Sequence, residues 1–361
     1  MEQSVRFRSG DWVEVRSKEE ILGTLDKNGQ LEAMPFMPEM FAFAGKRFQV
    51  SKRAHKTCDP VNGMDGRRMP NTVHLEDLRC DGAAHDGCQA GCLLYWKNAW
   101  LKRVDGPGGG GGASRPESAP AARPAQTDGC TEQDMENSIR VHGQDSSGDV
   151  TYVCQATRVA AATTHIRWWD IAQYFEDYTS GNVRLSQMFG SFVFEVCHTL
   201  ATAGLGFGSA VRWLYDAVQR IRGGVPYPWR NGMVPNGIRT PTAKLDLKEG
   251  EMVRMKSYSE VVETLDENWR NRGLYFDAEM APFCGGTYKV LKRVERIIHE
   301  GSGKMLIFKN AALILDGVAC EARYAKHRKF CPRAYYQYCR EIWLERVPAE
   351  NSGSPAGPSN H

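Results

Sequence analysis

The chain has 361 residues, of which 42% are hydrophobic and 25% charged, a composition typical of a globular protein long enough for two or three domains. Its formal net charge of +3 gives no strong case for a nucleic-acid partner. The first residues lack the apolar core of a secretory signal, so we expect a cytoplasmic protein. In that compartment the eleven cysteines should be metal ligands or reduced thiols rather than disulfides.

The sequence contains one repeat twice. Gly10 to Arg53 matches Gly250 to Arg293 without a gap, and about a third of the paired residues are identical. The identical pairs include Glu20/Glu260, Asp26/Asp266, Phe36/Phe276, Glu39/Glu279, Met40/Met280, Gly45/Gly285 and Cys80/Cys320. Three residues then enter the second copy, after which Cys88 to Val104 matches Cys331 to Val347. We assign repeat one to residues 8–104 and repeat two to residues 247–347.

Each repeat is predicted to open with a strand, followed by a short helix and a second strand. Ser17 and Ser257 occupy the N-cap position of the helix, and Glu20 and Glu260 stand where a capping box requires them. In repeat two, Gly301 to Lys304 is predicted to be a turn between two further strands. Short strands joined by tight turns resemble an SH3-like barrel. The predicted fold class is therefore mixed β plus α, with two small SH3-like barrels.

The segments outside the repeats differ in composition. Residues 105–150 begin with a run of glycines and continue with Ala, Pro, Ser and Gln, which predicts a flexible linker. Residues 151–246 form a middle segment with apolar residues at helical spacing, notably from Leu185 to Ile221, after a break at residues 179–182. Residues 348–361 are predicted to be a disordered tail.

Cysteines and histidines gather in repeat one. The spacing Cys80-x7-Cys88-x3-Cys92 brings three thiols into one glycine-rich loop, and Cys58 precedes them in the chain. We interpret these four cysteines as a metal site, with Cys88 and Cys92 on one face of a helix that runs on to Trp100. Zinc and an iron–sulfur cluster both accept four thiolates, and no C-x2-C knuckle decides between them.

Repeat two carries a different set. Cys284, Cys320 and Cys331 with His327 make a three-thiol, one-imidazole set, which suits tetrahedral zinc better than a cluster. Cys331 is followed by proline and is predicted to stand at a helix start.

The alternative for every cysteine is a buried thiol that packs as a small apolar side chain. We prefer that interpretation for Cys130, Cys154 and Cys197, which lie outside the repeats. For the repeat clusters we prefer metal, because ligand types recur at matched places in both copies. The sequence does not decide the roles of His74 and His85.

The segments Gly87 to Lys102 and Cys284 to Arg293, with Phe330-Cys331-Pro332-Arg333, resemble a family of functionally uncharacterised bacterial proteins. The resemblance spans both repeats and the middle segment. It implies an association with glycosyltransferase or surface-polysaccharide gene clusters and supplies no catalytic residue. His327 stands where this family is expected to carry a cysteine.

Two functional hypotheses follow. The first is a metal-binding accessory or scaffold protein of a bacterial biosynthetic pathway, with zinc in the repeats and a protein partner. The second is an enzyme whose first repeat holds an iron–sulfur cluster for redox or Lewis-acid chemistry. We find no nucleophile motif and no phosphate-binding loop, so the sequence does not establish that the protein is an enzyme.

Residues 188–222 raise a further hypothesis, peripheral contact with a membrane surface. Aromatic and aliphatic residues there lie near Arg212, Arg220 and Arg222, a combination found in interfacial helices. The competing interpretation is a pair of soluble helices packed on the repeats, because Glu195, His198 and Asp216 interrupt the apolar pattern.

Overall fold

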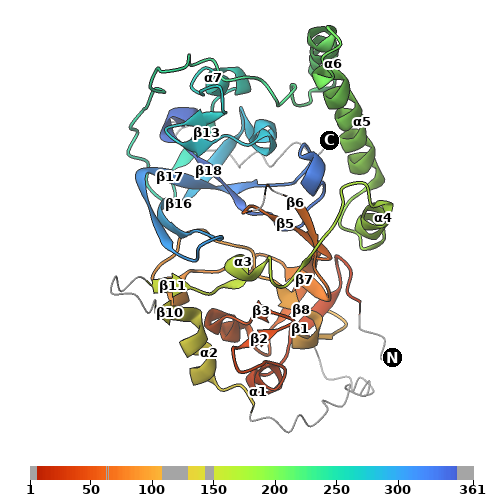
Figure 1. Ribbon diagram of the computed structural model, residues 1–361, viewed down its shortest axis with the longest axis vertical. Coiled ribbons are helices and arrows are strands. Elements are labelled where there is room, and N and C mark those ends of the chain that lie inside the picture. Colours follow the sequence, from red (N-terminus) through yellow and green to blue (C-terminus); the bar gives the residue numbers. More distant parts are fainter. Residues whose placement is uncertain (1–5, 62, 64, 108–128, 143–149, 348–361) are drawn as a thin grey trace. The chain divides into compact units, whose positions relative to one another are not determined.

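The computed structural model describes residues 6–61, 63, 65–107, 129–142 and 150–347 (Figure 1). It is a mixed α/β structure with several antiparallel sheets, and it divides into two compact units. The first unit contains the chain up to Asn182 together with Ile298–Leu306 and Cys331–Arg333. The second contains Val183–Ile297, Ile307–Phe330 and the chain from Ala334 onward. Two short segments of repeat two therefore belong to the unit built on repeat one.

Repeat one forms a five-stranded antiparallel sheet in the order β8-β7-β4-β1-β9. Its strands are β1 (Trp12–Val15), β4 (Arg47–Arg53), β7 (Thr72–Leu75), β8 (Trp96–Lys97) and β9 (Leu101–Arg103). The last strand pairs with the first, Val13 opposite Arg103. The described strands form no closed barrel.

Repeat two forms a sheet of the same order, β18-β17-β16-β13-β19. Its strands are β13 (Met252–Met255), β16 (Thr287–Ile298), β17 (Met305–Ala319), β18 (Tyr336–Cys339) and β19 (Leu344–Arg346). Val253 pairs with Arg346, as Val13 pairs with Arg103 in the first copy. The structure thus confirms the duplication at the level of strand order and register.

Local sequence signals account for the first helix of each repeat. In α1 (Lys18–Leu22) the Ser17 hydroxyl accepts from the Glu20 backbone N–H, and the Glu20 carboxylate accepts from that of Ser17. Ser257 and Glu260 do the same at α7 (Tyr258–Val262). The predicted capping boxes are confirmed, because they depend only on residues three positions apart. The predicted turn at Gly301 to Lys304 is also confirmed, since it joins β16 to β17.

The core of each repeat contains corresponding side chains. Phe36 packs edge-on against Trp100 with ring centroids 5.0 Å apart, and Phe276 packs against Trp343 at 5.2 Å in the second copy. Both tryptophans are fully buried. The Trp100 indole donates to the Thr24 hydroxyl, and Trp343 donates to Thr264.

The helix predicted from Cys88 to Trp100 is not formed. Instead Leu93 bridges Arg79, β8 follows, and η3 (Asn98–Trp100) completes the segment. Pairing of Val73 with Trp96 places both tryptophans of this segment in the core, so their four-residue spacing does not reflect a helix. Cys331 likewise begins no helix, because a turn leads from it into β18.

The range predicted as a flexible linker contains ordered elements. Thr131 caps α2 (Glu132–Ile139), which is followed by β10 (Arg140–His142). β10 pairs with β11 (Val150–Tyr152) of the middle segment. Residues 108–128 and 143–149 of the predicted linker, and the predicted tail, lie outside the described residues.

The predicted helical middle segment contains its helices between Gln155 and Arg222, and residues 223–246 form no helix. It contains α3 (Gln155–Arg158), β12 (Thr164–His165), α4 (Ile171–Thr179), α5 (Leu185–Thr202) and α6 (Gly208–Arg222). The predicted break separates α4 from α5. No helix of the described residues is long and apolar enough to cross a membrane.

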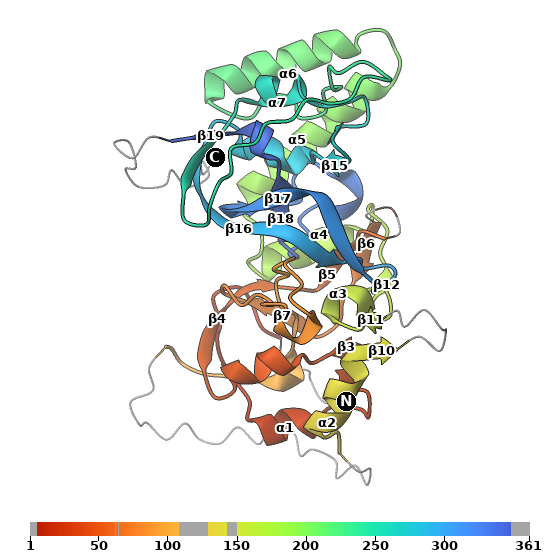
Figure 2. The same cartoon turned by 90° about the vertical axis from the view of Figure 1, so that its left-hand side faces the viewer.

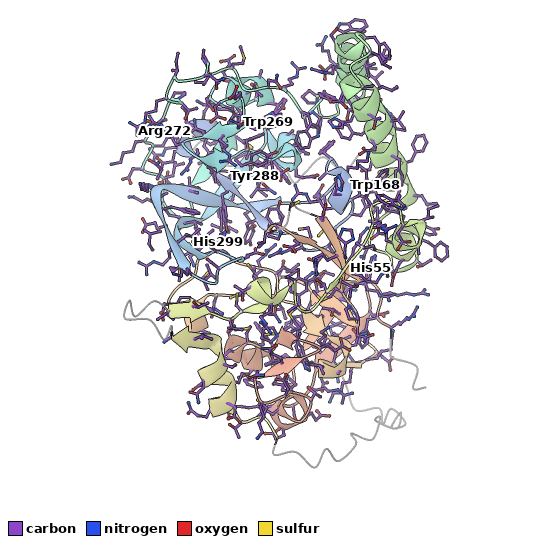
Figure 3. All side chains as sticks on the ribbon, viewed as in Figure 1. His55, Trp168, Trp269, Arg272, Tyr288 and His299 are labelled. Atoms are coloured by element: carbon purple, nitrogen blue, oxygen red, sulfur yellow. The ribbon has the colours of Figure 1, made fainter. Side chains whose placement is uncertain are left out.

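Helix α4 is fastened to repeat one by buried charges. Asp177 on α4 is fully buried and lies 2.6 Å from the ammonium of Lys56, which is 3% exposed. His55, labelled in Figure 3, lies 3.2 Å from the other Asp177 oxygen. These groups lie next to a hairpin of β5 (Lys56–Asp59) and β6 (Asp65–Arg68). A buried carboxylate with two basic neighbours fixes where the helix packs.

The remaining short elements connect these parts. They are β2 (Gln30–Leu31), β3 (Met34–Pro35), η1 (Pro38–Phe43), η2 (Ala83–His85), β14 (Arg270–Asn271), β15 (Leu274–Tyr275), η4 (Ala278–Phe283), η5 (Lys326–Arg328) and η6 (Glu341–Trp343).

Candidate metal centre

A tight loop from Cys80 to Cys88 positions the side chains of Cys80 and His85. The Asp81 carboxylate accepts from the Ala83 backbone N–H at 2.8 Å, which starts the turn that becomes η2. The Gly82 carbonyl accepts from the backbone N–H groups of His85 and Gly87. Gly82 has φ +80°, and a Cβ there would lie 1.9 Å from the Cys88 carbonyl oxygen. Only glycine allows the loop to close this tightly.

Within the described residues, one group of at least three His, Cys, Asp or Glu side chains converges as metal ligands could, and it consists of Glu39, Cys80 and His85. Their ligand atoms all lie within 4.8 Å of one another. Glu39 comes from η1, and its Oε1 accepts a hydrogen bond from the Cys80 thiol at 3.2 Å. The group therefore joins two segments of repeat one that are about forty residues apart in the chain.

His85 points one ring nitrogen into this group. Its side chain is buried, at 1% exposure, and Nε2 has no hydrogen-bond partner among the described residues. The Val153 backbone carbonyl hydrogen-bonds the ring, which leaves Nε2 with its lone pair available. A histidine held in this way is typical of metal ligands.

The β10–β11 hairpin covers His85. The Tyr152 ring packs edge-on against the imidazole with centroids 6.3 Å apart. The Tyr152 hydroxyl donates to the Asp86 carboxylate, which also accepts from Arg140. Residues from the predicted linker and the middle segment thus complete the surroundings of a ligand in repeat one.

The surroundings of the group favour uncharged side chains when no cation is present. Burial raises the pKa of the Glu39 carboxyl. Burial also raises the pKa of the Cys80 thiol, and the neighbouring Glu39 and Cys92 raise it further. Burial lowers the pKa of His85, although the hydrogen bond that its ring donates to the Val153 carbonyl acts in the opposite direction. Glu39 Oε2 also lacks a hydrogen-bond partner among the described residues. A divalent cation would satisfy both orphan atoms and favour the thiolate.

The donor chemistry distinguishes between the metals considered. One sulfur, one nitrogen and one oxygen form a set that zinc accepts, and three protein donors leave a fourth tetrahedral position for another ligand. Iron–sulfur clusters are held mainly by thiolates, and this group offers one.

The second repeat satisfies the corresponding carboxylate without a metal. Glu279, the counterpart of Glu39, is 1% exposed. One of its oxygens accepts from the backbone N–H groups of Tyr324 and Ala325 at 2.6 and 3.1 Å, and the other from that of Arg323 at 2.8 Å. These donors lie in the loop that is three residues longer than in repeat one. The longer loop thus supplies backbone N–H donors to both oxygens of Glu279, whereas Glu39 Oε2 has no donor among the described residues.

The counterpart of His85 is an arginine. The two loops end in matching turns, η2 and η5, which place Arg328 where repeat one has His85. The Arg328 guanidinium pairs with the buried carboxylate of Asp277, which stands at the position of Met37. Tyr335 accepts from Arg328 and stands at the position of Cys92. In repeat two, an ion pair with an additional hydrogen bond therefore stands where repeat one has the His85 imidazole and the Cys92 thiol.

The other predicted ligands of repeat one lie elsewhere. Cys58 is buried on β5, and its carbonyl accepts from Arg333 at 3.1 Å. The Cys88 sulfur accepts from the Ile298 backbone N–H at 3.4 Å. The Cys92 carbonyl accepts from the Cys80 backbone N–H at 2.8 Å, and burial raises the pKa of the Cys92 thiol to about 12. Of the predicted quartet, only Cys80 belongs to the converging group.

The set predicted in repeat two is not among the converging groups of the described residues. Cys284 ends η4, and burial raises the pKa of its thiol to about 12. Cys320 follows β17, His327 lies in η5, and Cys331 is one of the residues assigned to the first unit.

Sequence reasoning missed Glu39. Its identity with Glu279 was a signal, but Glu20 and Asp26 are also identical between the copies and serve a helix cap and a turn. Identity between the copies therefore does not separate a ligand from a structural carboxylate.

A cavity of about 700 Å³ lies in the second unit. Its lining includes Arg230, Tyr258, Ala281 and Cys284. Ala281 stands at the position of Phe41, whose ring packs 4.7 Å from Phe36 in the first copy.

No family model and no curated protein matches this chain.

Proposed function

We propose that the protein is a metal-binding accessory protein whose first repeat holds one zinc ion through Glu39, Cys80 and His85. The observation that carries the proposal is the contrast between the two copies. Repeat two satisfies Glu279 with three backbone N–H groups, whereas repeat one leaves Glu39 Oε2 and His85 Nε2 buried and unpartnered among the described residues. Buried polar atoms without partners are costly, and a bound cation removes that cost.

The proposed ion would have a structural effect. It would join η1 to the Cys80–Cys88 loop, and so stabilise repeat one, because metal binding to a site formed only on folding adds to folding free energy. The strand order of the duplicated sheets places the last strand beside the first, in agreement with an SH3-like barrel that the described strands leave open. Such a fold serves many roles, so the scaffold role is proposed from the structural effect of the ion. From the composition of its first residues, we expect this role in the cytoplasm. The sequence resemblance suggests a biosynthetic pathway such as that of a surface polysaccharide, in which we expect a protein partner.

A second candidate is Lewis-acid chemistry at the same ion. The three-donor set favours it, because zinc with three protein ligands retains a position for water or substrate. Cobalt(II) substitution separates the two candidates. Azide should change the cobalt spectrum if the fourth position exchanges, and should leave it unchanged if a further protein group fills that position.

Metal analysis of the full chain purified anaerobically tests the proposal. We expect about one zinc per chain in the wild type, and loss of that equivalent in Cys80→Ser and His85→Gln. Cys320→Ser, at the matching position of repeat two, should retain it. Folded wild-type protein without metal, or a Cys80→Ser variant with full metal content, would overturn the proposal. Two equivalents would instead support a second site at Cys284, Cys320, His327 and Cys331, and iron with inorganic sulfide would support the cluster.

A further inference from the structure

Helix α5 exposes an apolar face in place of a polar one. Its inner side buries Ser191, Phe194 and Ala201. Its outer side carries apolar residues at intervals of three and four, which form one stripe along the helix. They are Leu185, Phe189, Val193, Val196 and Leu200, exposed by 60%, 73%, 43%, 60% and 43%. A helix at the surface of a globular protein normally turns polar residues to water.

The outer face of α5 also lacks charge. Glu195 is the one Asp, Glu, Lys or Arg within the eighteen residues of α5. Its side chain is 14% exposed and lies 3.2 Å from the ammonium of Lys329. This charge is neutralised on the inner side, so nothing charged interrupts the outer stripe.

The turn after α5 and helix α6, which packs against α5 (Figure 2), also expose apolar residues. Leu205 and Phe207 in the glycine-rich turn are exposed by 66% and 43%. On α6, Trp213 is 71% and Ile221 87% exposed, and no residue of α6 is fully buried. Together these residues and the α5 stripe form what we call the α5–α6 face.

The exposed cations within residues 185–222 lie near the end of α6. Arg220 and Arg222 are exposed there. The Arg212 guanidinium turns inward, donating to the Ala201 carbonyl at 3.3 Å and lying over the ring of buried Tyr227. Besides Glu195, residues 185–222 contain one acidic residue, Asp216, which pairs with Arg230. The face therefore combines an uncharged apolar stripe, an exposed tryptophan and arginines without exposed acids.

We infer that the α5–α6 face binds the surface of an anionic lipid bilayer, lying in the interface without crossing it. Apolar side chains and tryptophan enter the headgroup boundary of a bilayer, and arginines attract its anionic headgroups. A second copy of the chain is a poorer occupant. A two-fold contact through this face would bring the arginines of both copies together without acids to pair them. The inference is independent of the proposed metal centre.

Sedimentation of the full chain with vesicles tests this inference. We expect binding to phosphatidylcholine vesicles that contain phosphatidylglycerol, which salt should weaken, and weaker binding to phosphatidylcholine alone, which salt should not weaken. Phe189→Ser and Trp213→Ser should each reduce binding severalfold, and Arg220→Glu with Arg222→Glu by about tenfold or more. Ile307→Ser removes an apolar side chain that is 65% exposed on β17 and should leave binding unchanged.

Circular dichroism of each variant shows whether it is folded. Absence of vesicle binding by the wild type would overturn the inference. Equal loss of binding in Ile307→Ser would do the same, because the effect would then not belong to this face. A wild-type dimer in light scattering that Trp213→Ser converts to a monomer would assign the face to a second copy.

Discussion

His74 is a buried imidazole outside the proposed metal centre. It is fully buried on β7, its Nδ1 lies 2.9 Å from the Leu94 carbonyl oxygen, and its ring packs 4.7 Å from Tyr95. Burial lowers the pKa of His74 to about 3, although the Leu94 carbonyl acts in the opposite direction. The folded protein therefore holds a neutral imidazole over a pH range in which the unfolded chain takes up a proton.

This difference predicts a loss of stability in acid. Below about pH 6.5 the unfolded state binds a proton that the folded state excludes, so His74 lowers the free energy of unfolding as pH falls, by about 1.4 kcal/mol per pH unit until about pH 3. Urea unfolding of the wild type and of His74→Phe between pH 7 and pH 4.5 checks it. The wild type should lose about 3 kcal/mol more than the variant. Parallel pH profiles would contradict the assignment to His74.

Single residues show where sequence reasoning succeeds and where it stops. Cys80 is one of the four cysteines predicted as ligands in repeat one, and it belongs to the converging group, but its recurrence as Cys320 does not distinguish it from Cys88, which recurs as Cys331. Cys58 and Cys88 could not be excluded, because spacing along the chain does not determine the direction of a side chain. The sequence also does not align His85 with Arg328, because the loop is three residues longer in repeat two. The structure aligns them, since each is the last residue of its turn, η2 or η5.

At the scale of elements, signals confined to a few neighbouring residues predict structure well. The capping boxes at Ser17 and Ser257, and the break between α4 and α5, needed no distant partner. The segment before Trp100 was predicted wrongly, because β8 is defined by pairing with β7 and that pairing is invisible to local periodicity. Ordered α2, in a segment otherwise typical of linkers, shows that composition alone set the linker boundary too broadly.

The Cys80–Cys88 loop offers a prediction at this scale. Gly82→Ala places a Cβ 1.9 Å from the Cys88 carbonyl oxygen at φ +80°, whereas Gly87→Ala, at φ +75°, meets nothing within 4 Å. The matched pair thus separates the clash from the backbone strain that both variants share. Gly87→Ala should cost about 1–2 kcal/mol in urea unfolding, and Gly82→Ala about 2 kcal/mol more together with reduced zinc content. Equal effects of the two substitutions would contradict the prediction, because they would mean that the loop shifts enough to remove the clash with the Cys88 carbonyl oxygen.

At the scale of the whole molecule, the two copies do not coincide with the two units. Ile298–Leu306 and Cys331–Arg333 come from repeat two but belong to the first unit. Within that unit Arg333 is 4% exposed, and its guanidinium lies 2.6 Å from Glu300 and 3.1 Å from the Cys58 carbonyl oxygen. The Tyr152 backbone N–H donates to the Gly303 carbonyl at 2.8 Å. The first unit is therefore built from residues of both copies, so repeat one does not form it alone. An alignment of the two copies cannot show this, because it does not tell which residues pack together.

The Arg333–Glu300 pair should accordingly contribute to the stability of the first unit. Arg333→Met removes the guanidinium and leaves Glu300, whose side chain is 24% exposed, without this cation. We expect a loss of about 3 kcal/mol in urea unfolding, because breaking one partner of a buried pair leaves the other charge uncompensated. Arg254→Met breaks the exposed pair with Glu345 and should cost less than about 1 kcal/mol. Adding Glu300→Gln to Arg333→Met should recover part of the loss, since the stranded charge is then removed. Equal costs for Arg333→Met and Arg254→Met would mean that the segments from repeat two contribute no stability to the first unit through this pair.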